Sequence, residues 1–244
     1  MFQQFFAAAR GFFGAILIIF DRFWHQGAIS GMREWVPTIE LASFPIEEQE
    51  AIWNLNLALS SLNNYLKDFQ AALALFDFCE SQCQALQERR EPIPRNWLMP
   101  WQFIAGRDGA MTIFHFGKTI ESIKESGFFG CPTLKAKIDH AQLRIGAKLF
   151  RQWFRDFERV RHSVAHAAEL QKNQESRKRN SMRGASMQNV LVGRNFQNTH
   201  GGRILSYEIG QTTMTRLKRT QDQFFAPFKE FDQFSEFYQS PPAP

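Results

Sequence analysis

Residues 151–169 carry the side chains best suited to chemistry on an anionic substrate. Projected as a helix with about 100° per residue, the segment separates into two faces. The apolar face is formed by Phe157, Val160 and Val164. The opposite face lies within about 40° of one line and is mostly cationic: Arg151, Arg155, Arg159, His162, His166 and Glu169. Because like charges at i, i+4 repel, this row of side chains predicts an anionic partner or screening by solvent.

The residue types in this segment suit cleavage of RNA by its own 2′-hydroxyl. That reaction needs a base, an acid and a cation that stabilises the charged transition state. Imidazole exchanges protons at cellular pH, and guanidinium contacts phosphate through two donors. We therefore expect His166 to transfer protons, Arg161 to hold the phosphate and His162 to position or assist, with no metal or other cofactor. Zinc is a weaker interpretation of the His162–His166 spacing, because no Glu follows the first His and the neighbouring arginines repel a cation.

The run Arg161-His-Ser-Val-Ala-His166 resembles the Arg-polar-x-x-x-His motif of the HEPN superfamily. Arg161 matches the motif Arg, His162 the polar second position and His166 the motif His. The resemblance covers about residues 45–170 and implies an all-helical, HEPN-like antiparallel bundle with metal-independent endoribonuclease activity. It also implies a homodimer with two motifs across a shared cleft, and it makes an antitoxin-like protein a candidate partner.

Further candidate substrate-binding residues lie outside the motif. Asp108 and His115 belong to a polar stripe on a predicted helix over 106–126, which lines a cleft or is a plain surface face. Residues 171–220 contain ten Lys and Arg but only two acids. This excess predicts either a polyanion-facing surface or a solvated basic loop. From these segments we select as substrate-binding candidates Asp108, His115, Arg155, Arg159, Arg177, Lys178 and Arg179.

The composition is that of a globular protein. Of its 244 residues, 44% are hydrophobic and 22% charged, which excludes disorder of the whole chain. The 26 Phe against 3 Tyr indicate packing surface. Three Cys without a C-x-x-C motif indicate neither a disulfide framework nor a cysteine zinc site, so a reducing cytoplasm is expected. No P-loop, G-x-G-x-x-G or G-x-S-x-G motif is present.

Apolar residues at helical spacing predict mainly α structure. The spacing predicts one long helix or two over 46–90, a helix over 106–126 and a helical repeat over 134–170, with a break near 150–154 as an alternative. A mobile loop over 172–189, a β-hairpin over 190–208 and a final helix from Gln211 follow. The expected organisation is therefore an N-terminal extension, 1–43, a helical domain, 44–171, and a C-terminal segment, 172–244.

The apolar run 11–20 is too short to span a bilayer. Residues 1–31 are either a peripheral amphipathic segment or sequence upstream of a true start at Met32. A third hypothesis for function, a membrane-peripheral protein, would use this segment. The main rival to the ribonuclease is a catalytically inactive helical module for dimerisation or nucleic-acid binding.

Overall fold

The longest helix follows directly from the spacing of its apolar residues. The computed structural model describes residues 35–93, 97–170 and 172–234. Helix α2 (Gln49–Glu88) is a single helix of 40 residues, about 60 Å long. It contains no Pro or Gly, and it buries a stripe at steps of three and four: Ile52, Leu55, Leu59, Leu62, Leu66, Phe69, Leu73 and Phe76. The alternative of two helices is therefore excluded.

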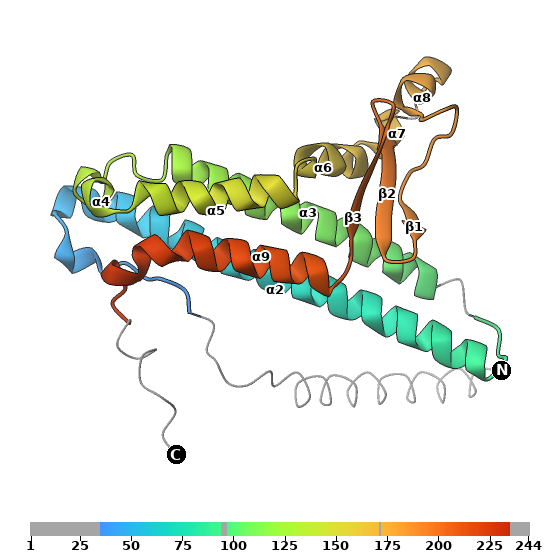
Figure 1. Ribbon diagram of the computed structural model, residues 1–244, viewed down its shortest axis with the longest axis horizontal. Coiled ribbons are helices and arrows are strands. Elements are labelled where there is room, and N and C mark those ends of the chain that lie inside the picture. The colour runs from blue at the N-terminus through green and yellow to red at the C-terminus, as the bar shows by residue number, and fades with distance from the viewer. Residues whose placement is uncertain (1–34, 94–96, 171, 235–244) are drawn as a thin grey trace, which may run out of the picture. The chain divides into compact units, whose positions relative to one another are not determined.

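Helix α3 (Leu98–Glu125) runs back along α2 and starts eight residues before the predicted start at Gly106. The early start includes Pro100, which the first turn of a helix tolerates because its amides have no intrahelical partner there. Figure 1 shows the two helices side by side in opposite directions. They form the base on which the other elements pack.

The predicted helical repeat over 134–170 is broken into four helices: α4 (Pro132–Lys137), α5 (His140–Trp153), α6 (Phe157–Ala165) and α7 (Ala167–Leu170). The Asp139 side chain caps α5 by accepting from the amides of Ala141 and Gln142. Between α5 and α6, Phe154 leaves helical geometry and packs its ring 5.0 Å from that of Phe150. The break raised as an alternative near 150–154 thus lies at the end of α5.

Part of the predicted loop over 172–189 is helical. Helix α8 (Gln174–Asn180) is capped by Asn173, whose side chain accepts from the Ser176 amide at 2.8 Å. The prediction of a loop over the whole segment was wrong, because local capping and tertiary hydrogen bonds order a basic sequence with no apolar stripe.

The predicted hairpin is present and gains a third strand. Strands β1 (Val190–Val192), β2 (Asn195–His200) and β3 (Arg203–Glu208) form an antiparallel sheet in the order β1-β2-β3. His200 and Arg203 are register partners across a turn in which Gly201 and Gly202 both have positive φ. This backbone needs two residues that tolerate left-handed geometry, which explains the Gly-Gly pair.

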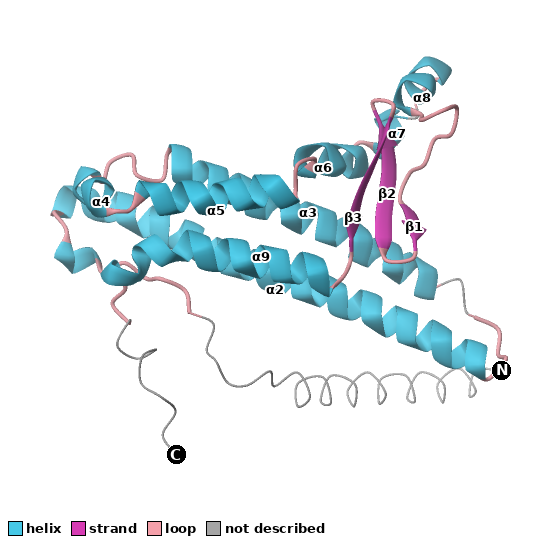
Figure 2. Ribbon diagram, in the orientation of Figure 1, coloured by secondary structure: helices cyan, strands magenta, loops and turns pink. Residues whose placement is uncertain are grey.

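The final helix, α9 (Gln211–Phe225), packs along α2 and α5 and is followed by a 3₁₀ turn, η3 (Ala226–Phe231). Figure 2 shows the strands lying beside the helices, so that the small sheet does not form a layer of its own. Phenylalanine fills the interior, as the composition indicated. In the described ranges, eight Phe side chains are fully buried: Phe69, Phe76, Phe116, Phe150, Phe196, Phe224, Phe225 and Phe228. The mainly α class with a small C-terminal sheet and a final helix is confirmed.

The described residues from Val36 onward belong to one compact unit. The predicted segments 44–171 and 172–244 therefore pack together wherever they are described. The last residues of the predicted extension 1–43 also join this unit, since Ile39 is buried and exchanges two 2.9 Å hydrogen bonds with the Asn56 side chain. The predictions for residues 1–31 lie outside the described part of the chain. Within that part, no helix combines the length and apolar content needed to cross a membrane.

Candidate functional site

Helix α6 packs between α3 and the sheet. Phe157 packs against Phe114 of α3, with ring centroids 6.1 Å apart. Val160 is buried with Ala110 of α3 and Leu205 of β3. These contacts fix the rotation of α6, and they leave Arg159 and His162 exposed.

Three histidines meet at the outer face of α6. The ring centroid of His162 lies 4.6 Å from that of His166 and 5.2 Å from that of His200. His200 is the last residue of β2 and approaches from the sheet. It was absent from the sequence-based candidates. The only signal for it was its position before the Gly-Gly turn, which says nothing about the helix it faces.

His166 is held where α6 ends. It has left helical geometry, with φ −113° and ψ 25°, and its Nδ1 lies 3.0 Å from Oε1 of Glu169. The hydrogen bond from His166 is the first cause of the lowered pKa of Glu169, followed by the positive charge of the same ring. With Nδ1 directed at the carboxylate, Nε2 is the nitrogen available to a substrate.

Arg161 is a cation without an acidic partner. Its guanidinium carbon lies 5.1 Å from the centroid of the Phe114 ring, and its Nε is buried with no hydrogen-bond acceptor. Among the described residues no carboxylate lies within ion-pair distance of it. Neighbouring arginines differ, because Arg159 pairs with Asp156 at 3.2 Å and Arg151 with Glu121 at 3.0 Å. Among the described residues, Arg161 is therefore a guanidinium whose charge is left for an anion, as is that of the exposed Arg155.

The environment of His200 is cationic. The pKa of His200 is lowered, first by burial and then by the positive charges of His162 and Arg159. Arg203 lies directly across the hairpin from it. These surroundings favour the neutral ring, which can accept a proton.

The basic helix α8 lies next to the histidine cluster. The Ser176 hydroxyl donates to the Leu170 carbonyl at 3.0 Å, and the Gly201 amide donates to Oδ1 of Asn180 at 3.2 Å. These bonds join α8 to α7 and to the turn that follows His200. The predicted substrate-binding residues of α8 are all exposed: Arg177, Lys178 and Arg179.

The other candidates lie elsewhere. Arg155 is exposed in the bend before α6, so it does not extend the row on that helix. On α3, His115 stacks on Tyr65 of α2 with centroids 5.7 Å apart. Asp108 has a raised pKa, first from burial and then from the negative charge of Asp68, also on α2. Asp108 and His115 thus face α2, and the polar stripe lines no cleft with α6.

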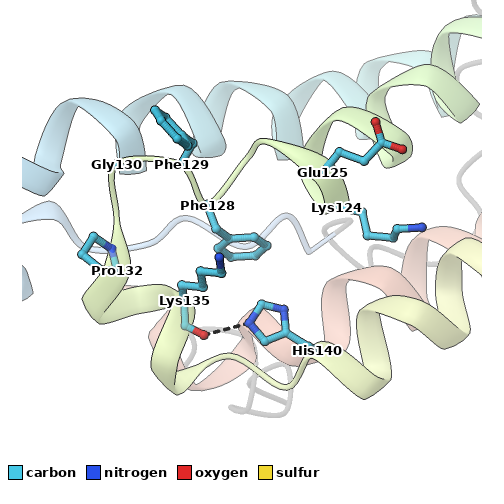
Figure 3. A pocket seen from close by; sticks show the side chains of 8 residues that line it. All are labelled: Lys124, Glu125, Phe128, Phe129, Gly130, Pro132, Lys135 and His140. Carbon is cyan, nitrogen blue, oxygen red and sulfur yellow. Dashed lines mark hydrogen bonds between the residues drawn. The ribbon is translucent and has the colours of Figure 1, made fainter.

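Two hollows occur at the opposite end of the bundle, and no motif residue lines either. One has a volume of about 330 Å³ and is lined by Lys124, Phe128 and His140 among others, as Figure 3 shows. There Nε2 of His140 lies 2.8 Å from the Lys135 carbonyl oxygen. The histidine site is instead an open surface. Within the described ranges, no group of three or more His, Cys, Asp or Glu side chains is arranged to hold a metal ion.

Comparison of the chain with models of protein families, with curated proteins and with solved structures finds no match.

Proposed function

We propose that this protein is a metal-independent endoribonuclease of the HEPN type, with Arg161, His162 and His166 at its active site. The observation that carries the proposal is the unpaired Arg161 guanidinium on α6, together with the ring contact between His162 of the same helix and His166, which follows its last residue. A guanidinium that lies against an aromatic ring and has no carboxylate partner favours an incoming anion, because a phosphate supplies the negative charge that the described residues do not. In RNA that anion is the phosphate at the cleaved bond.

The pair formed by His166 and Glu169 supports proton transfer. The carboxylate orients the ring and offsets the charge that the ring carries when protonated. The exposed Nε2 can then exchange a proton with the substrate. The His162 ring lies beside this ring at a tilt of 30°, where it can help to position it.

The cations of α8 support RNA as the polymer that binds. Contacts to successive phosphates supply affinity that does not depend on sequence. The hydrogen bond from the Gly201 amide to Asn180 joins α8, which carries these cations, to the turn that follows His200. A cytoplasmic location, a toxin-like role in defence and an antitoxin-like protein that covers the site belong to the same proposal.

A test combines the purified full-length chain with mixed RNA in EDTA. We expect cleavage of RNA but not of DNA, since DNA lacks the attacking 2′-hydroxyl. His166→Ala and Arg161→Lys should each lower the rate by at least about 100-fold. The Arg161→Lys variant tests the need for the planar guanidinium group, because lysine keeps the positive charge but lacks the two parallel N–H donors.

Two variants at distant positions serve as controls. His140→Gln removes a histidine at the opposite end of the bundle, and Arg144→Lys alters an exposed arginine on α5. Both should keep the wild-type rate. No cleavage by the wild type, or equal cleavage by wild type and His166→Ala, would overturn the enzyme proposal. RNA binding without cleavage would favour the rival, a nucleic-acid-binding module.

A further inference from the structure

His200 is held on the site from two sides. Its neighbour Thr199 is fully buried and exchanges hydrogen bonds with the Met187 backbone, at 2.8 Å through its amide and 2.9 Å through its hydroxyl. On its other side, the Gly201 amide is bonded to Asn180. With both neighbours anchored, the His200 ring is set against His162 by the backbone, with a tilt of 73° between the rings.

The two outer histidines have opposite electrostatic surroundings. His166 faces the carboxylate of Glu169, with Lys172 beyond it. Within the described part of the chain, the charged or titratable groups found around His200 are His162 and Arg159 on α6, and Arg203 across the hairpin. A carboxylate favours the protonated ring, whereas nearby cations favour the neutral ring. Two like groups in contrasting environments are the arrangement used to separate an acid from a base.

Ring contacts join His162 to both outer histidines, and within the described residues none joins His166 to His200 directly. The middle ring therefore separates two proton-transfer groups that lie on different elements. If the scissile phosphate of an RNA lay above His162, the attacking 2′-oxygen of the ribose would lie toward one outer histidine. The leaving oxygen would lie toward the other.

We propose that His200, on the β-hairpin, is the general base of this ribonuclease and that His166 is its general acid. The inference rests on the proposed function and adds a catalytic residue to it. Neutral His200 takes the proton of the 2′-hydroxyl while the 2′-oxygen forms a bond to phosphorus. The bond from phosphorus to the 5′-oxygen breaks, and protonated His166 gives its proton to that oxygen. The products are a 2′,3′-cyclic phosphate and a 5′-hydroxyl, so atoms and charge balance.

The test uses an RNA whose scissile 5′-oxygen is replaced by sulfur. A thiolate leaves without being protonated, so this substrate no longer needs the general acid but still needs the base. On ordinary RNA, His166→Ala and His200→Ala should each be slower than wild type by at least about 100-fold. On the sulfur substrate, His166→Ala should recover to within a few-fold of wild type, and His200→Ala should stay slow.

His200→Gln guards against loss of the hairpin, because the amide keeps the size and hydrogen bonding of the ring without transferring a proton. Circular dichroism should show both His200 variants folded. In the wild type the rate should rise with pH at the acidic side as His200 loses its proton, and this rise should vanish in His200→Gln.

Three results overturn the inference while leaving the ribonuclease intact. In the first, both His200 variants cleave ordinary RNA at the wild-type rate. In the second, the sulfur substrate restores cleavage by His200→Ala. In the third, the sulfur substrate fails to restore cleavage by His166→Ala. If the wild type cleaves neither substrate, the proposed function and the inference both fail.

Discussion

The hydrogen bond between His166 and Glu169 links the candidate site to the pH dependence of folding. Glu169 has its pKa lowered from the ordinary value of 4.5, chiefly by the hydrogen bond from His166. A carboxyl whose pKa is lower in the folded state stabilises the protein above its unfolded pKa. That contribution is lost as the pH falls through the folded value.

We therefore predict that Glu169→Gln unfolds at lower denaturant concentration than wild type at pH 6, and that the difference between the two midpoints is smaller at pH 3. Urea unfolding followed by circular dichroism measures this difference. Glu125→Gln, at an exposed carboxylate on α3, is the control and should show little change of the difference with pH. A difference for Glu169→Gln that is the same at both pH values would contradict the pairing.

At the scale of elements, one arginine fastens the sheet to α2. Arg194, in the turn between β1 and β2, forms ion pairs with Asp77 and Glu80, and its Nε donates to the Ile209 carbonyl at 2.8 Å. Its guanidinium also covers the ring of Phe76, 5.0 Å from the centroid. The sheet that delivers His200 is thus tied to the longest helix.

We predict that Arg194→Ala destabilises the protein by about 1–3 kcal/mol, since hydrogen bonds to charged groups and a cation over an aromatic ring are lost together. Hydrogen exchange should become faster in β2 before it does in α2. Arg219→Ala, at an exposed position on α9, should leave both unchanged. Equal rates of amide hydrogen exchange in β2 of the wild type and of Arg194→Ala would show that Arg194 does not hold the sheet on α2.

A glycine lets the sheet approach α3. A Cβ at Gly106 would clash with the Phe196 ring, which is fully buried, and the Gly106 carbonyl accepts from the Tyr207 hydroxyl. We predict that Gly106→Ala costs about 1–3 kcal/mol through overpacking. Adding Phe196→Leu should recover part of that loss, because the smaller side chain makes room for the methyl group. Thermal unfolding of the two single variants and the double variant measures the coupling, and strict additivity would show that the two side chains do not collide.

At the scale of the whole molecule, the proposed site is open on one side. His162, Arg155 and Arg159 are exposed, and nothing in the described part of the chain encloses a substrate over them. A second copy related by two-fold symmetry would enclose it, as the HEPN resemblance implies. Facing cations repel unless an anion lies between them, and salt screens that repulsion.

We therefore predict a homodimer that phosphate or RNA tightens. Sedimentation at tens of micromolar protein should show a larger dimer fraction with phosphate than with chloride at equal ionic strength. Arg155→Ala combined with Arg159→Ala should dimerise without phosphate, and Arg144→Ala should behave as wild type. A strictly monomeric protein under all these conditions would contradict the arrangement.

The amino-acid sequence by itself determined where most of the helical structure lies, the hairpin turn and the motif, but not helix α8 or the start of α3. The periodic apolar residues of α2, the Gly201-Gly202 pair and the spacing from Arg161 to His166 are local features, and short-range geometry is enough to interpret them. The sequence also separated the faces of α6, because Phe157 and Val160 require a core.

Only the tertiary structure decided which element lies next to each helix face. Asp108 and His115 share a face, but the packing of α3 turns that face toward α2. The chain bends at Phe154 because its ring is buried with Phe150, and this bend takes Arg151 off α6. His200 reaches His162 because the hairpin register and the contact of Phe196 with Gly106 place the end of β2 beside α6. These placements depend on side-chain packing between residues far apart in the chain, which periodicity does not encode.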